Sequence, residues 1–496
     1  MNVSSLLKRT ADTYPQKIAL IEDEEKISYE RLWQQIASLS NAFRSIGIRK
    51  NTRVAILLPN CKEFIYSFFA LLNVNAIAVP VKPQMTCWEL SGIFKNCTPE
   101  VVILTPTLLN KILDESPSLL ANRTLIVREE TREIPILDKE GHLEESLLHT
   151  LSDLYEMGRR DGDQRWKTHN TSSRQVASIN YTYRGYGYPL GAMLTHTNYI
   201  HGSFNDIRHR KLSSTETHLL VLPCTHILPL EGSILAPLLV GAKVVIVDNY
   251  SSKKIFHAIS SNKVNIVILV PTLFSALLRH YKSAQHDISS LKYGISGGSF
   301  MSVQLNRLIK EKMNLDVLQG YGLTECQPVT CNYLSNNKPE TLGLPLHGVQ
   351  MRIVDEKGRD CEIGKVGEIL IKTSQNMAGY YRNKRDTMRV LKDGWLCTGD
   401  YGKVDQNGYV YFEGLKKHIV KVGGNAVDIA ELRNLILSVK QVEDVTFDLH
   451  EDVVWGHKIA AKITRGRDHD SFTSNDLRRV LRRRISSYKI PHKLSM

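Results

Sequence analysis

The sequence predicts an α/β fold, because short strand-like runs alternate with helical stretches through its first two thirds. Strand candidates are the apolar, β-branched runs at Val54–Leu58, Ile77–Val81, Val101–Leu104 and Thr124–Val127. Between the first two lies Phe64–Val74, whose apolar residues recur with helical spacing. Farther along, Val264–Leu278 predicts a strand, a Pro-Thr turn and then a helix. This order favours parallel strands with helices packed on the sheet.

The last third predicts a different kind of unit. Short apolar runs separated by turn residues occupy 343–355, 366–372, 377–383 and 393–402. Runs of this length without long intervening helices favour a small β-rich subdomain. We expect it near residues 335–413, where it closes the large α/β domain.

The composition predicts a soluble, cytoplasmic protein. Apolar residues make up 42% and charged residues 23% of the 496 residues. No apolar run is long enough to span a bilayer, and the N-terminal stretch lacks the apolar core of a signal peptide. The eight cysteines include no Cys-x-x-Cys pair. We therefore expect them to be packing residues in a reducing compartment rather than zinc ligands.

The net charge of +13 is concentrated late in the chain. Leu477–Lys489 predicts a basic helix with arginines on more than one face, which is not the pattern of a membrane-binding helix. It is either a solvated helix face or a contact for an anionic partner, such as coenzyme A phosphates or an acidic carrier protein. We predict no nucleic-acid partner, because no module with interleaved aromatic residues accompanies the helix.

One glycine-rich stretch, residues 181–198, has the composition of a loop that bends sharply and lets a ligand approach closely. It carries Gly185, Gly187 and Gly191 together with Pro189. Taken alone, it is more typical of an ordinary surface hairpin. Its residue order resembles the phosphate loop of the AMP-forming adenylating enzymes, which include acyl-CoA synthetases, aryl-CoA ligases, luciferases and peptide-synthetase adenylation domains.

Residues 317–325 are the most specific match to this family. The resemblance implies that Tyr321 stacks on adenine, that Thr324 touches a phosphate and that Glu325 holds magnesium. An aromatic face, a hydroxyl and a carboxylate suit these three ligands. The alternative for Gly-Tyr-Gly is a plain turn, which the order of the preceding motifs makes a poor interpretation.

Two further residues receive roles from the resemblance. His226 matches a histidine beside the carboxylate of the acid substrate, although a single histidine in an apolar run is more often a core residue. Asp400 matches the aspartate that binds both ribose hydroxyls, although it could also be a turn residue. The catalytic candidates are therefore His226, Thr324 and Glu325. The residues expected to bind ATP or AMP are Thr182, Arg184, Gly185, Gly187, Ser296, Gly297, Gly298, Gly320, Tyr321, Gly322 and Asp400.

The chain departs from the family pattern where cations would act. Bulky Tyr183 and Arg184 stand where the family has serine and glycine, and Leu190 replaces the loop lysine. Leu415 replaces an arginine, and the sequence stops at Met496, before the family's last lysine. Arg184 could in principle hold a phosphate. Because one lost donor of charge typically costs about 3 kcal/mol of transition-state stabilisation, we expect impaired adenylation.

The resemblance also implies the domain organisation. We expect a large N-terminal domain over 1–414 and a small, mobile α+β domain over 415–496, shortened relative to the family. Lys417 stands at the family's hinge position between them.

Two functions stay open. The first is an acid–thiol ligase of the acyl-CoA synthetase type, which uses ATP and magnesium to join a fatty or aryl acid to coenzyme A or a carrier thiol. In this chain its adenylation would be impaired or altered. The second is a non-adenylating relative that binds AMP, an acyl-adenylate or an acyl-thioester as a binding or scaffold protein. Acid-dependent ATP–pyrophosphate exchange, run beside AMP binding, separates the two.

Overall fold

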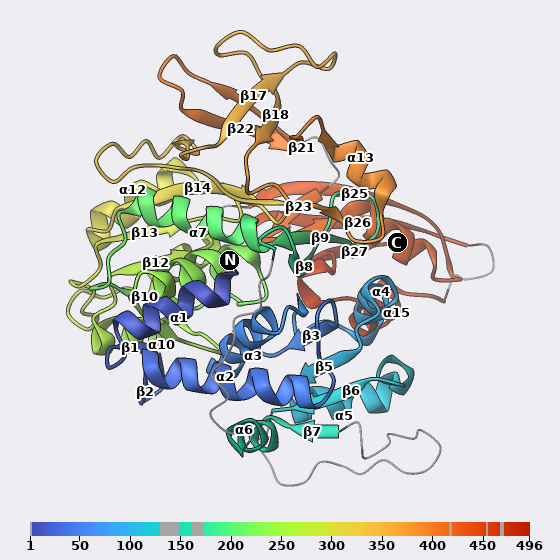
Figure 1. The fold of residues 1–496 in the computed structure, drawn as a ribbon. Coiled ribbons are helices and arrows are strands. Elements are labelled where there is room, and N and C mark those ends of the chain that lie inside the picture. Colours follow the sequence, from blue (N-terminus) through green and yellow to red (C-terminus); the bar gives the residue numbers. More distant parts are fainter. Residues whose placement is uncertain (1, 129–147, 161–171, 416–418, 453–454, 467–470) are drawn as a thin grey trace.

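The computed structural model describes residues 2–128, 148–160, 172–415, 419–452, 455–466 and 471–496. Within these residues the chain forms four β-sheets, with helices packed on the larger two (Figure 1). The predicted α/β class is confirmed. Lys417, at the expected hinge, lies outside the described residues.

The first large sheet contains the strands predicted from the first third of the chain. Its order is β19-β9-β8-β4-β3-β5-β6-β7, and the strands from β8 to β7 in that order pair in parallel. The four early strand predictions are correct to within one residue at either end. The strands span Arg53–Leu57 (β3), Ile77–Pro80 (β4), Val101–Leu104 (β5), Thr124–Val127 (β6), Leu148–Thr150 (β7), Val176–Thr182 (β8), Leu190–Thr195 (β9) and Gly379–Tyr380 (β19).

The second large sheet has the order β16-β15-β14-β13-β12-β10-β11-β1-β2. Its central strands are parallel, while β14 and β15 form an antiparallel hairpin. Gly-Tyr-Gly at 320–322 lies in β14, so the plain-turn alternative for it is wrong. The strands span Ile18–Glu22 (β1), Glu25–Ser28 (β2), Thr217–Leu220 (β10), Lys243–Ile246 (β11), Ile266–Leu269 (β12), Tyr293–Ser296 (β13), Val317–Leu323 (β14), Cys326–Cys331 (β15) and Leu344–Pro345 (β16).

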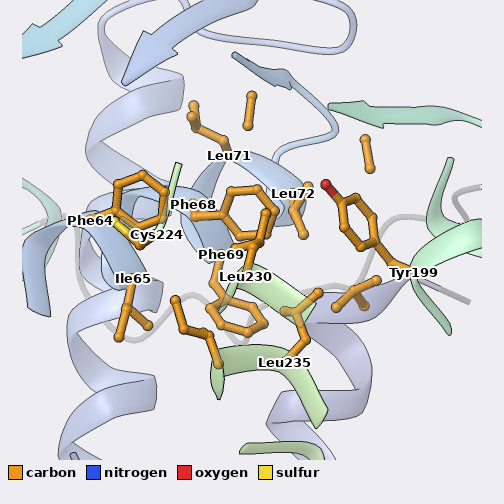
Figure 2. Packing of buried hydrophobic residues seen from close by; sticks show 14 of the residues in the cluster. Phe64, Ile65, Phe68, Phe69, Leu71, Leu72, Tyr199, Cys224, Leu230 and Leu235 are labelled. Carbon is orange, nitrogen blue, oxygen red and sulfur yellow. The ribbon is translucent and has the colours of Figure 1, made fainter. Parts of the chain in front are cut away.

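A buried helix, α3 (Lys62–Asn73), holds the two large sheets together. Every residue from Phe64 to Asn73 is buried, because residues of both sheets belong to the core cluster around the helix. Figure 2 shows Phe68 and Phe69 packed among Leu230, Leu235 and Tyr199. At the start of α7 (His196–Arg210), the Thr195 side chain accepts from the Asn198 backbone N–H and the Asn198 side chain accepts from the Thr195 backbone N–H. This capping box fixes the chain direction after the glycine-rich hairpin.

The remaining helices of the N-terminal part lie on the faces and edges of these sheets. They span Val3–Thr13 (α1), Tyr29–Ser45 (α2), Cys87–Cys97 (α4), Pro106–Glu115 (α5), Leu151–Arg160 (α6), His196–Arg210 (α7), Ile227–Pro229 (α8), Ala236–Leu239 (α9), Ser252–Asn262 (α10), Pro271–His280 (α11), Val303–Met313 (α12) and Lys384–Val390 (α13). The strand–turn–helix prediction for 264–278 is confirmed by β12 and α11.

A third, antiparallel sheet projects from the two large ones (Figure 1). Its strands are Gln350–Val354 (β17), Gly367–Lys372 (β18), Leu391–Lys392 (β20), Trp395–Val404 (β21) and Val410–Leu415 (β22). This sheet occupies the region where the β-rich subdomain was expected. Its strand β21 carries Asp400 back towards the second large sheet.

A fourth sheet and two helices form the C-terminal part. The strands are Ile419–Val422 (β23), Asn425–Asp428 (β24), Val442–Asp452 (β25), Gly456–Arg465 (β26) and Lys493–Ser495 (β27), and the helices are Ile429–Leu437 (α14) and Ser474–Arg484 (α15). They enclose a core of their own around Leu432, Leu435, Leu477 and Leu481. The boundary at residue 415, the mobility and the shortening of this part stay predictions.

The basic segment near the end forms α15, which lies beside α4 (Figure 1). Leu477 and Leu481 face the core, whereas Arg479, Arg482 and Arg483 are exposed. Six of the eight cysteines are buried, as expected for packing residues. Among the described residues, no helix combines the length and apolarity needed to cross a bilayer.

Candidate active site

Residues from distant motifs converge where β13, β14 and β21 meet. Ser296 ends β13 and pairs in register with Gln319 on β14, two residues before Tyr321. The Tyr321 hydroxyl donates a hydrogen bond to Asp400 Oδ2 at 2.6 Å. The Ser296 hydroxyl is buried and has no hydrogen-bond partner among the described residues. The three residues expected around an adenosine therefore lie together.

Hydrogen bonds hold the backbone of Asp400 in place. The Asp400 N–H donates to Thr398 Oγ1 at 3.0 Å, and the Thr398 hydroxyl donates to the Ile369 carbonyl at 2.7 Å. Burial, and then the Asp400 carboxylate, raise the pKa of Tyr321 well above its usual value, so this phenol stays protonated. A carboxylate accepts through several lone pairs, so Asp400 has the chemistry to accept from ribose hydroxyls.

The glycines around these side chains let the backbone pack closely. A Cβ added at Gly297 would lie 3.0 Å from Leu228 Cδ2, and Gly298 has a φ of +79°. A Cβ added at Gly298 would lie 3.9 Å from the carbonyl oxygen of Gly424, in the turn between β23 and β24. The expected adenine side of the site thus lies next to the C-terminal part of the chain. Gly320 and Gly322 lie on β14, across from β15.

His226 lies near two lysines. Burial, followed by the charges of Lys82 and Lys421, lowers the pKa of His226 far below its usual value, so the imidazole is neutral at pH 7. Burial, and then the charge of Lys489, lowers the pKa of Lys82 to about 8. Lys82 Nζ donates to Asn425 Oδ1 at 2.7 Å, across the junction with the C-terminal part. A neutral imidazole that feels the charges of two lysines suits a carboxylate or phosphate ligand.

The glycine-rich stretch is a hairpin in which only its tip is a loop. Thr182 on β8 pairs in register with Leu190 on β9, and the turn covers 183–189. The Leu190 side chain is 2% exposed and belongs to the main core cluster. The position that carries an amine in the family therefore points into apolar packing here.

Arg184, in the turn of this hairpin, is 2% exposed. Its Nη1 donates to Glu325 Oε1 and to the Tyr380 hydroxyl, both at 3.0 Å. Its Nη2 donates to the carbonyl oxygens of Cys397, at 2.8 Å, and of Thr398. Burial opposes the charge, but the Glu325 carboxylate raises the pKa of Arg184, so the guanidinium stays charged.

Glu325 follows Thr324 in the short turn between β14 and β15, and its side chain is 3% exposed. Besides the bond from Arg184, its Oε1 accepts a hydrogen bond from the Tyr380 hydroxyl at 2.5 Å. Among the described residues, no group of three or more His, Cys, Asp or Glu side chains could hold a metal ion. The magnesium expected at Glu325 does not fit these residues, because a guanidinium already faces the carboxylate.

The C-terminal part covers the outside of the same loop. The Gly187 N–H donates to Asp428 Oδ2 at 3.0 Å, and a Cβ at Gly187 would lie 2.9 Å from Asn434 Nδ2 on α14. Lys489 Nζ lies 4.5 Å from the ring centroid of Tyr183. A donor that the family pattern assigns to a phosphate is therefore bonded to protein here.

Lys489 was not singled out in the sequence, yet it joins the two parts of the chain. Its Nζ lies 2.8 Å from Glu89 Oε1 on α4 and 3.0 Å from Glu431 Oε2 on α14, and its side chain is 2% exposed. The Ser486 hydroxyl also donates to Glu89, at 2.7 Å. The Thr86-x-x-Glu89 spacing is the signature of a capping box, which the structure confirms. That signal predicts a helix start but not the second role of Glu89.

Comparison with known proteins identifies related sequences. The profile of the family described as AMP-binding enzyme matches residues 7–381. An indoleacetate–CoA ligase of Aromatoleum aromaticum is 27% identical over 497 residues, covering 99% of this chain and 93% of that protein. A long-chain-fatty-acid–CoA ligase of Bacillus subtilis is 25% identical over 509 residues, covering 99% and 90%.

Solved structures show the same fold. The amide bond synthetase McbA from Marinactinospora thermotolerans matches with a TM-score of 0.84 at 20% identity, covering 100% of this chain and 95% of that one. An anthranilate CoA ligase in complex with anthranoyl-AMP matches with a TM-score of 0.78 at 22% identity, covering 100% and 93%. Because the family profile spans most of the sequence, the chain belongs to the AMP-binding enzyme family, within the AMP-forming adenylating enzymes.

Proposed function

We propose that this protein is an acid–thiol ligase of the acyl-CoA synthetase type that binds AMP or an acyl-adenylate and adenylates its acid poorly. The acid is fatty or aryl, and the thiol is coenzyme A or a carrier thiol. The relatives named as indoleacetate–CoA and long-chain-fatty-acid–CoA ligases support this substrate class. The expected roles of Tyr321 and Asp400 towards adenosine are part of the proposal.

One observation carries the claim of poor adenylation: the Arg184 side chain, which belongs to the loop that should receive a triphosphate, is buried and bonded to protein groups. Four of the five N–H groups of a guanidinium are bonded here to Glu325, Tyr380 and two carbonyl oxygens. The buried Leu190 supplies no amine in compensation. Since losing one such donor typically lowers kcat by about 100-fold to 1,000-fold, ATP-driven turnover should fall by at least that factor.

The test measures acid-dependent ATP–pyrophosphate exchange with a panel of fatty and aryl acids, beside AMP binding by calorimetry. We expect AMP to bind while exchange stays at least about 100-fold below that of a catalytically complete ligase assayed in parallel. Exchange at an ordinary rate with any acid would refute impaired adenylation. Failure to bind AMP would refute the nucleotide site.

A second assay separates the ligase from a binding or scaffold protein. The protein receives a synthetic acyl-adenylate and coenzyme A, so that the ATP-dependent step is bypassed. Release of AMP with formation of the thioester supports the ligase. The non-adenylating alternative is favoured by the cover over the loop, where Asp428 takes the Gly187 N–H, and it predicts tight binding of the adenylate without turnover.

A further inference from the structure

We infer that Arg184 takes the place of a divalent metal ion in this site, so that the nucleotide is bound without magnesium. The inference deepens the proposed nucleotide site. It concerns which cation stands against Glu325, whereas the proposed function concerns whether ATP is consumed. The two therefore fail on different measurements.

The ion pair between Arg184 and Glu325 is fully enclosed. Both side chains are at most 3% exposed, and the N–O distance is 3.0 Å. The Tyr380 hydroxyl bonds to both partners, to Glu325 Oε1 at 2.5 Å and from Arg184 Nη1 at 3.0 Å. A buried carboxylate that already has a charged partner and a second hydrogen-bond donor gains little by binding another cation.

A magnesium ion would need what this arrangement does not provide. It demands near-ideal octahedral geometry and keeps several waters, which requires space around the carboxylate. Here the carbonyl oxygens of Cys397 and Thr398 hold Arg184 Nη2, which fixes the guanidinium against Glu325. Entry of a hydrated ion would break these bonds and leave the buried guanidinium of Arg184 without its carboxylate partner.

The arginine at position 184 accounts for this replacement of a metal ion by a side-chain cation. The family pattern has a glycine at the position of Arg184, and a glycine there leaves the acid open to a metal. In this chain the positive charge is part of the polypeptide. Arg184 Nε is buried and has no hydrogen-bond partner among the described residues. The pair itself is neutral, which suits one phosphate better than a triphosphate–metal complex.

The first test uses the unaltered protein. AMP affinity is measured by calorimetry in buffer with magnesium chloride and in buffer with EDTA. We expect the two dissociation constants to agree within twofold. A loss of affinity of tenfold or more in EDTA would overturn the inference.

The second test needs no nucleotide, so it decides even if AMP does not bind. Mn²⁺ uptake is followed by electron paramagnetic resonance in the unaltered protein, in Arg184→Gly and in Arg184→Gly/Glu325→Gln. We expect Arg184→Gly to gain one Mn²⁺ site that the double variant loses. Arg389→Ala is the matched control, because it removes a nearby arginine that is paired with Asp386 instead.

Equal Mn²⁺ uptake by the unaltered protein and by Arg184→Gly would overturn the inference. Should Arg184→Gly not fold, the comparison of AMP affinity in magnesium and EDTA still decides. ATP–pyrophosphate exchange at an ordinary rate would refute the proposed function, but the Mn²⁺ measurement would still test this inference. Metal-dependent AMP binding with negligible exchange would sink this inference alone.

Discussion

Replacing Lys489 with methionine removes the cation that joins the C-terminal part to α4. The substitution leaves the Glu89 and Glu431 carboxylates, whose side chains are at most 5% exposed, without their shared partner. Breaking a buried ion pair by removing one member costs about 3–5 kcal/mol. The unfolding entropy is about 2.1 cal/mol/K per residue, or roughly 1 kcal/mol/K for a chain of this size. The Tm should therefore fall by about 3–5 °C.

Differential scanning calorimetry at pH 7 measures this shift. Lys462→Met is the matched control, because Lys462 is exposed on β26 and its loss should change the free energy of unfolding by no more than about 0.5 kcal/mol. Adding Glu89→Gln to Lys489→Met should recover part of the loss, since it removes one of the two facing carboxylates. A Tm within 1 °C of that of the unaltered protein would show that the ion pairs of Lys489 with Glu89 and Glu431 do not stabilise the fold.

Three further predictions concern the site. Arg184→Gly/Leu190→Lys should raise acid-dependent ATP–pyrophosphate exchange by at least about 10-fold, because it frees the loop and restores an amine; unchanged exchange would contradict the role of the loop. Asp400→Ala should weaken AMP binding about 10-fold or more by calorimetry, since hydrogen bonds to a charged group contribute about 1.5–3 kcal/mol; an unaltered affinity would remove Asp400 from the site. Burial places the pKa of Lys82 at about 8, below its usual 10.5. Its ammonium is therefore lost as pH rises through 8, and affinity for an acyl-adenylate should fall there, whereas Lys82→Met should show no such step. The effect of Lys82 on stability has the opposite sign. Between pH 8 and 10.5 the unfolded chain binds a proton at Lys82 that the folded chain does not, so the free energy of unfolding rises with pH over that window.

Strand predictions succeeded where apolar, β-branched residues form a continuous run. Val101–Leu104 and Thr124–Val127 are strands with those bounds, since continuous β-branched runs are typical of buried parallel sheet. The Gly-Tyr-Gly run was harder, because glycine in a strand interior gives the same local signal as a turn. It lies in β14 because β15 pairs with it, which is a contact that no local pattern reveals.

That Tyr321 and Asp400 lie close together could be predicted from motifs, since the two residues keep their positions in the family order and meet at 2.6 Å. The direction of the Arg184 side chain could not. The sequence left it as a possible phosphate ligand, and only the fold brings Glu325 and Tyr380 within its reach. Lys489 was missed for the same reason, because its partners Glu89 and Glu431 lie far away in the sequence.

These ion pairs determine which cationic side chains remain to bind an anionic ligand. Arg184 is balanced by Glu325, and Lys489 faces two carboxylates, so neither leaves excess positive charge at the glycine-rich loop. Lys82 and Lys421 differ, because burial lowers the pKa of each and neighbouring carboxylates do not fully compensate. A phosphate or carboxylate placed between them would supply that compensation. The ligand's negative charge is therefore expected beside His226 and the turn between β23 and β24, so binding should depend on how the C-terminal part is seated.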